Sequence, residues 1–167
     1  GKSVMIKCLI GLEIPDSGTI EIMSQKLEHL SLKALDEIRA DIGFLFQGSA
    51  LYDSMTVREN LEFPLRRHIS KFGNVKDTLP LVEEALQNVG LKNVIDLMPN
   101  ELSGGMKRRV ALARTLILKP KIIIYDEPTT GLDPITSKEI ILLMKSVQKK
   151  YKTSSIIITH DVDCARV

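Results

Sequence analysis

Several features that would place this chain in a special class are absent from its sequence. Its 2 cysteines, Cys8 and Cys164, lie far apart, which argues against a disulfide framework and for reduced thiols. No apolar run approaches the roughly 20 residues of a membrane-spanning helix, so no transmembrane segment of its own is expected. The 23 basic and 21 acidic residues nearly balance, which argues against a nucleic-acid partner. The 167 residues carry no repeats and suffice for one sizeable core.

An apolar segment followed by two acids is the first sign of chemistry. Residues 122–125 are continuously apolar, as in a strand buried on both faces of a parallel sheet. Asp126 and Glu127 follow at its carboxyl end, where open α/β sheets bind ligands. Asp126 is therefore a candidate Mg²⁺ ligand, directly or through water, and Glu127 could orient or deprotonate an attacking water. Taken alone, such a pair is more often two solvated acids at a strand end.

A serine and two glycines precede a well-specified helix. Ser103 is a strong N-cap residue, and Gly104 and Gly105 leave backbone N–H groups open to close approach. Free N–H groups at a helix N-terminus bind anions. The apolar stripe that follows predicts a helix that stops at Lys119–Pro120. An ordinary capped helix after a glycine turn is the alternative interpretation.

The chain begins with Gly1, Lys2 and Ser3, followed by a mostly apolar helix that Gly11 is placed to end. These residues match the last part of the G-x-x-x-x-G-K-[ST] loop, in which lysine reaches the β/γ-phosphates and serine contacts Mg²⁺. A signal peptide is the rival interpretation, but Lys7 interrupts the apolar run and no cleavage site follows. We therefore expect the chain to start inside such a loop.

Two further predicted strands lead into polar residues. Residues 42–46 predict a strand before Gln47, and residues 155–159 predict one before His160. A single glutamine or histidine after a strand is more often a loop or surface residue. The assignment of both therefore depends on the order of the other motifs.

That order resembles an ATP-binding cassette (ABC) ATPase over essentially the whole chain. Residues 102–106 resemble its signature, Asp126–Glu127 its Walker B pair, and residues 131–133 its D-loop. The resemblance implies an α/β fold, a P-loop NTPase with a RecA-like parallel sheet core and an α-helical ABC subdomain. A single, incomplete nucleotide-binding domain is expected over 1–167. Residues 1–49 and 119–167 would form the core and residues 50–118 the helical subdomain.

The resemblance also implies a site for ATP and Mg²⁺. Glu127, His160 and Gln47 are the implied catalytic residues, and Ser3, Gln47 and Asp126 the implied metal ligands. The implied nucleotide-binding residues are Gly1, Lys2, Ser3, Ser103, Gly104, Gly105 and Asp133. In the family, the signature contacts ATP held by the other subunit, and the D-loop aspartate crosses that interface. Met106 stands where the commonest family form has glutamine, which questions a side-chain contact but not the backbone cradle.

The implied partners are a second ABC ATPase subunit, forming a homodimer, and an integral-membrane permease. The chain would then act as a peripheral ATPase at the cytoplasmic face of the inner or plasma membrane, with the 167 residues inactive by themselves. The permease is expected to dock beside residues 48–68, through the apolar residues Leu51, Tyr52, Met55, Phe63 and Leu65. These residues could instead form the subdomain's own core.

Within the family, residues 46–61, 63–66, 97–99 and 133–136 resemble the ATPases of Mla/Mce-type phospholipid transporters, which implies lipid transport. Importers of amino acids or other small solutes share the general pattern and remain an alternative. A soluble ABC ATPase of DNA repair is the other class, but no long coiled coil separates the motifs. A ribosome-binding tandem cassette is disfavoured by the low basic charge.

Overall fold

The computed structural model describes residues 2–72 and 77–166, apart from the side chains of residues 2, 3, 69 and 70. Three parallel strands form its central sheet in the order β3-β4-β5: β3 (Ile42–Leu45), β4 (Ile122–Asp126) and β5 (Ser154–Ile158). The register pairs Leu45 with Tyr125 and Asp126 with Ile158, so all three strands end at one edge. This confirms the expected parallel α/β sheet.

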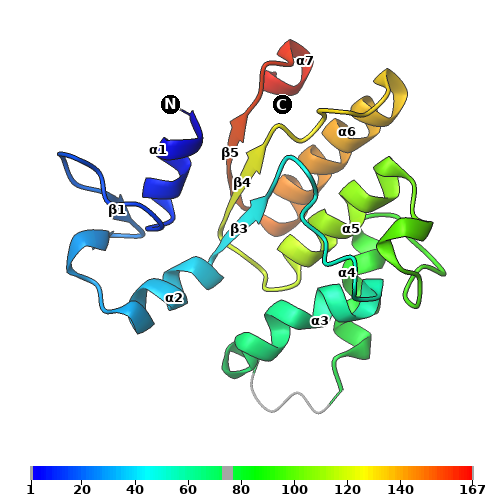
Figure 1. Ribbon diagram of the computed structural model, residues 1–167, viewed down its shortest axis with the longest axis horizontal. Coiled ribbons are helices and arrows are strands. Elements are labelled where there is room, and N and C mark those ends of the chain that lie inside the picture. The colour runs from blue at the N-terminus through cyan, green and yellow to red at the C-terminus, as the bar shows by residue number, and fades with distance from the viewer. Residues whose placement is uncertain (1, 73–76, 167) are drawn as a thin grey trace.

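Helices lie on both faces of the sheet (Figure 1). Successive side chains of a strand point to opposite faces, so each face has its own set of contacts with the helices. On one face, Ile124 and Ile158 pack with Ile6 of α1 (Lys2–Leu9). On the other face, Ile123 and Tyr125 belong to the main hydrophobic cluster, with α5 (Gly104–Leu116) and α6 (Pro134–Tyr151). The continuous apolar run of β4 is thus explained by burial on both faces.

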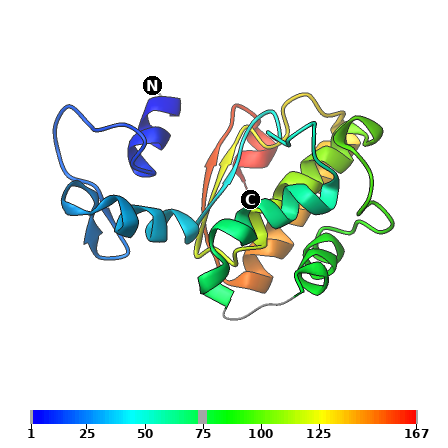
Figure 2. The ribbon, with the colours of Figure 1, turned by 60° about the horizontal axis from the view of Figure 1, so that its bottom comes forward.

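The segment between β3 and β4 is helical. It contains α3 (Val57–Arg67), α4 (Leu79–Asn88) and α5, which lie on the opposite side of the sheet from residues 2–41 (Figure 2). Thr56 and Glu59 match a capping box in the sequence, which predicts the start of a helix, and they form this box at the start of α3. The main cluster joins buried residues of this segment, such as Leu61 and Leu112, to Leu45 of the sheet. The division into a core and a helical subdomain at 50–118 stays a prediction.

The remaining elements are short. They are β1 (Glu21–Ile22) and β2 (Gln25–Lys26), which pair antiparallel, α2 (Leu32–Ala40), α7 (Val162–Ala165) and the 3₁₀ turns Leu27–His29, Ile69–Phe72 and Pro99–Glu101. The apolar stripe from Leu79 to Val89 predicts a helix that ends at Gly90, and Gly90 follows α4 with φ +72°. Among the described residues, none of the helices is long and apolar enough to span a membrane.

One predicted boundary was wrong. Thr136 and Glu139 match a capping box, which predicts a helix that starts after Thr136. Instead α6 begins at Pro134, and Asp133 accepts hydrogen bonds from the backbone N–H groups of Ile135 and Thr136, both at 3.0 Å. A carboxylate that satisfies two N–H groups, with a proline at the first helical position, outcompetes the later threonine.

Candidate functional site

The carboxyl edge of the sheet gathers the polar residues that follow its strands. Gln47 lies two residues beyond β3, Glu127 directly follows β4, and His160 lies two residues beyond β5. Asp126 is the last residue of β4. Since the three strands end in register, four residues that are up to 113 positions apart in the sequence meet at one edge.

Glu127 and His160 are directly paired. His160 Nδ1 lies 2.9 Å from Glu127 Oε2, which also accepts the Thr130 hydroxyl at 3.3 Å and the His160 backbone N–H at 3.4 Å. The other carboxylate oxygen, Oε1, accepts no hydrogen bond from the part of the chain that the structure describes. The Glu127 side chain is 15% exposed and that of His160 74% exposed. One carboxylate oxygen is therefore anchored while the other is left for an external donor.

Three physical features of Glu127 accompany this pairing. Its φ of +48° lies in the left-handed region, which a non-glycine residue adopts only when its surroundings hold it there. Its backbone N–H donates to the Ile158 carbonyl at 2.8 Å, which fixes the turn after β4 to the end of β5. Burial acts to raise the pKa of Glu127, but the hydrogen bonds and charge of His160, together with Thr130, bring it below its ordinary value.

Asp126 and Gln47 provide the donors that suit a magnesium ion bound mostly by phosphates and water. Asp126 is half-buried, whereas Gln47 is exposed. No group of three or more His, Cys, Asp or Glu side chains that could hold a metal is found among the described residues. This donor set does not form an all-protein cage, and Mg²⁺ does not need one because it keeps several waters and is held by one or two carboxylates plus phosphates. The residues therefore fit Mg²⁺ bound together with a nucleotide.

Helix α1 carries the beginning of the chain to this edge. Its N-terminal end lies on the side to which the strands point (Figure 1). Ile6, 2% exposed, anchors the helix on Ile124 and Ile158. Lys2 and Ser3 form the first turn of α1, and their side chains, like the whole of Gly1, lie outside the described residues. A helix N-terminus at this position suits a phosphate group.

The segment that resembles the signature lies elsewhere, against the loop before α6. Ser103 caps α5, with its hydroxyl accepting the Met106 N–H at 3.2 Å. A Cβ added to Gly105 would stand 2.7 Å from Thr136 Cγ2, whereas one on Gly104 would stand 3.6 Å from Leu132. Gly105 is thus required by packing within this chain as well. Within the described residues, no hydrogen bond joins Ser103 to the carboxyl-edge residues.

Asp133 is occupied inside its own chain. Besides the two backbone N–H groups, it accepts the Thr136 hydroxyl at 2.5 Å. That hydroxyl is the main reason that the pKa of Asp133 lies below its ordinary value, with the backbone N–H groups contributing. Any contact of Asp133 across a subunit interface stays a prediction, since its carboxylate already serves as the N-cap of α6.

Sequence reasoning missed two residues that support the site. Thr130 donates to Glu127, and buried Arg108 on α5 donates to the carbonyls of Phe46 and Thr130. A signal for Arg108 existed: it precedes the apolar residues Ala111 and Leu112 by three and four positions, which puts it on the buried face of a helix. Nothing in the sequence around Thr130 distinguishes it from Thr129.

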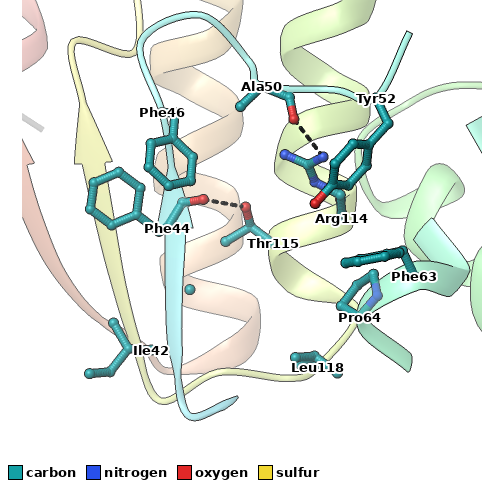
Figure 3. A pocket seen from close by; sticks show the side chains of 11 residues that line it. Ile42, Phe44, Phe46, Ala50, Tyr52, Phe63, Pro64, Arg114, Thr115 and Leu118 are labelled. Carbon is teal, nitrogen blue, oxygen red and sulfur yellow. Dashed lines mark hydrogen bonds between the residues drawn. The ribbon is translucent and has the colours of Figure 1, made fainter. Parts of the chain in front are cut away.

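A hollow of about 420 Å³ lies between β3 and α3, and Phe46 and Ala50, on either side of Gln47, are among its lining residues (Figure 3). Tyr52 and Phe63, 44% and 43% exposed, line it with ring centroids 5.0 Å apart. Arg114 lies over the Tyr52 ring, with 5.8 Å between its guanidinium carbon and the ring centroid. Of the predicted docking residues, Leu65 is fully buried in the core, so the apolar set is divided between core and surface.

Comparisons with known proteins agree with the motif order. The model of the family described as ABC transporter matches residues 1–130. A probable ribonucleotide transport ATP-binding protein of Mycobacterium leprae is 42% identical over 166 residues, which cover 99% of this chain and 47% of that protein. The intermembrane phospholipid transport ATP-binding protein MlaF of Haemophilus influenzae is 39% identical, covering 98% of this chain and 61% of MlaF. The chain thus spans about half the length of such relatives.

Among solved structures, a dimeric ATP-binding cassette in a post-hydrolysis state, bound to ADP and Pi, superposes with a TM-score of 0.85. It is 35% identical, and the match covers 99% of this chain and 72% of that one. The fold is that of these cassettes, as the motifs predicted.

Proposed function

The chain belongs to the ABC transporter family, and on this premise we propose that it is the ATP-binding and ATP-hydrolysing part of a transporter's ATPase subunit. The observation that carries the proposal is the hydrogen-bonded pair of Glu127 and His160 beside Asp126, at the sheet edge that the N-terminus of α1 also faces. If the proposal holds, an anchored carboxylate, a metal ligand and an anion site would surround one point.

Each of these residues would have a separate role in the transfer of the γ-phosphoryl group to water. The first turn of α1, with Lys2, would hold the β- and γ-phosphates. Ser3, Asp126 and Gln47 would hold Mg²⁺, which when bound neutralises developing charge on the phosphate oxygens. Glu127 Oε1, free of hydrogen bonds from described residues, would orient the attacking water and accept its proton.

His160 holds Glu127 in place and faces the same space. With Nδ1–H donated to Glu127 Oε2 at 2.9 Å, Nε2 donates to a phosphate only when the imidazole carries a proton on each nitrogen. A γ-phosphate oxygen would be the acceptor for that second N–H. His160 would therefore act both as an orienting partner of the base and as a donor to the transferred group.

A second copy of the chain would complete the site. Ser103 and Gly104 are exposed at the N-terminus of α5, and no hydrogen bond joins Ser103 to the carboxyl-edge residues within the described chain. A head-to-tail homodimer would bring this helix end to the γ-phosphate bound by the partner. The cassettes that superpose on this chain are described as dimeric, which supports the proposal.

The proposal is tested by ATP turnover of the full-length protein and its dependence on Mg²⁺. We expect hydrolysis that stops when EDTA removes Mg²⁺, and an Asp126→Asn variant that requires more Mg²⁺ for half-maximal rate. Glu139→Gln, at an exposed position of α6, is the matched control and should behave as wild type. A full-length protein that binds no ATP, or that hydrolyses it equally without Mg²⁺, contradicts the proposal.

The hollow lined by Tyr52 and Phe63 is the proposed docking site for a membrane permease, which would hold this protein peripherally at the cytoplasmic face. Two half-exposed aromatic rings beside a cavity provide an apolar surface that a protruding helix can fill. The loop that follows Gln47 forms one wall of the hollow, so docking there would act on the ATP site through a short segment.

Cysteine crosslinking tests this surface in the assembled transporter. With Cys8 and Cys164 replaced by alanine, a cysteine at position 52 should crosslink to a cytoplasmic helix of the permease. A cysteine at Lys145, on the exposed face of α6, is the control and should not. If position 52 stays free in an active complex, the docking surface lies elsewhere.

We further propose phospholipid as the transported substrate. The support is the resemblance of residues 46–61 to the ATPases of Mla/Mce-type systems and the 39% identity to MlaF. The full-length protein, reconstituted with its permease, should show ATP turnover stimulated by phospholipid and not by amino acids. Stimulation by an amino acid instead supports the importer alternative.

A further inference from the structure

Two arginines of α5 hold the loop that contains Gln47. Arg108 Nη1 donates to the Phe46 carbonyl at 2.7 Å. Six residues later, Arg114 donates to the Ala50 carbonyl at 2.8 Å (Figure 3) and to the Ser49 carbonyl at 3.1 Å. Ser49 and Ala50 have φ values of +64° and +48°, a conformation that needs such support in residues other than glycine. The loop is therefore fixed to the signature helix on both sides of Gln47.

Arg108 also reaches the loop that contains Glu127. Its Nη2 donates to the Thr130 carbonyl at 3.3 Å, and the Thr130 hydroxyl donates to Glu127 Oε2 at 3.3 Å. A continuous path of hydrogen bonds thus runs from Phe46, next to Gln47, through Arg108 and Thr130 to Glu127 and His160. The Arg108 side chain therefore connects both loops to α5.

The environment of Arg108 is unfavourable for a residue that only fills space. It is 4% exposed, burial lowers its pKa, and no carboxylate pairs with it in the described chain. Its Nε is buried and has no hydrogen-bond partner among the described residues. A buried, unpaired guanidinium is costly, whereas an apolar side chain could fill the same volume. What the guanidinium adds is a planar fork that binds two carbonyls at once in one fixed geometry.

We infer that Arg108 is a positioning residue that makes the placement of Gln47 and Glu127 depend on each other and on helix α5. Because Ser103 caps the N-terminus of α5, a nucleotide that docks on that helix end would act on both residues through Arg108. The inference rests on the proposed ATPase function for its kinetic consequence, but the physical link can be measured without turnover.

The kinetic test compares Arg108→Met with Arg109→Met in the full-length protein. Arg109 is the matched control, since it also lies on α5 and bridges two segments, donating to the Val89 carbonyl and to Glu139, both remote from the site. We expect Arg108→Met to lower kcat about 10- to 100-fold while KM for ATP changes less than about threefold, because a displacement of about 1 Å can cost 10²-fold. Arg109→Met should keep kcat within about threefold of wild type.

Arg108→Lys keeps the charge but cannot bind both carbonyls in the same geometry, so an intermediate kcat is expected. Combining Arg108→Met with Gln47→Ala should give a loss smaller than the product of the two single losses, because both act through the same loop. A folded Arg108→Met variant with wild-type kcat overturns the inference, as does a kcat loss that matches that of Arg109→Met.

Hydrogen exchange tests the link independently of catalysis. Arg108→Met, or Arg108→Lys if the former does not fold, should speed exchange in both 46–50 and 127–133, whereas Arg109→Met should not affect either loop. Unchanged exchange in both loops overturns the inference. A wild-type protein without ATPase activity but with this exchange pattern would instead contradict the proposed function and leave the link established.

Discussion

The proposed ATP site has two halves, one at the carboxyl edge of the sheet and one at the start of α5. They differ in how far contacts within the chain hold their residues in place. Glu127 is held by His160, Thr130 and a backbone bond to Ile158. Ser103 and Gly104 are exposed, and the Ser103 hydroxyl caps its own helix. The difference indicates that the first half works within one subunit, whereas the second presents a surface to another molecule.

The largest effect is expected from Glu127→Gln in the full-length protein. The amide keeps nearly the same shape and can still accept the His160 bond, but it cannot take a proton from water. ATP hydrolysis should fall roughly 10²–10⁴-fold while ATP binding is retained, and a closed dimer should accumulate. Steady-state phosphate release and size-exclusion chromatography measure the two. Near-normal turnover would remove Glu127 from its proposed role.

The second half of the site should fail differently when Ser103 is replaced by arginine. The bulky cation blocks the N-terminus of α5, so we expect turnover to fall roughly 10²–10³-fold, as when a phosphate-facing donor is lost elsewhere. ATP binding to the separate subunit should be unchanged, because the carboxyl edge is intact. Loss of that binding would show that Ser103 acts within its own subunit or in folding.

Mixing two inactive variants sharpens the same comparison. Ser103→Arg leaves the carboxyl-edge half intact, and Lys2→Ala leaves the signature half intact. A mixed dimer then contains one complete site, so the mixture should recover part of the wild-type ATPase rate. No recovery, although mixed dimers form, would contradict a site built from two subunits.

The two glycines of the signature should differ in stability. A methyl group at position 105 meets Thr136 at 2.7 Å, whereas one at position 104 has 3.6 Å to Leu132. Gly105→Ala should therefore destabilise the full-length protein by about 1–3 kcal/mol, and Gly104→Ala by less than about 1 kcal/mol. Urea unfolding measures both. Adding Thr136→Ser, which removes the offending methyl group but keeps the hydroxyl bonded to Asp133, should restore much of the loss; equal effects of both glycines contradict the packing argument.

The smallest effect concerns the protonation of Glu127. Its folded pKa lies below the unfolded value of 4.5, so its ionised form stabilises the fold above pH 4.5 and that contribution is lost as pH falls through the folded pKa. For a pair that solvent can reach, this contribution to the free energy of unfolding is about 1 kcal/mol or less. His160→Ala should raise the Glu127 pKa in an NMR titration of its carboxyl carbon. An unchanged pKa would show that the 2.9 Å contact is not formed in solution.

Much of the fold followed from local pattern. The apolar run before Asp126, the Ser103 cap, the Thr56–Glu59 capping box and Gly90 after α4 all lie where the sequence predicted them. Each of these signals depends on neighbouring residues, which is why it can be recognised without the fold. The start of α6 was predicted wrongly, because two adjacent capping signals compete and only the hydrogen bonds of Asp133 decide between them.

The sequence by itself determined the parallel α/β fold, the family and the polar residues that follow each strand. Only the tertiary structure decided which of these residues touch. It pairs His160 with Glu127 across two strands, sets Gly105 against Thr136, and selects Arg108 from a run of three basic residues as the one that is buried between two loops. Contacts between segments 22 to 62 residues apart arise from packing of the whole chain, and a local sequence pattern does not say how close two such segments lie in space.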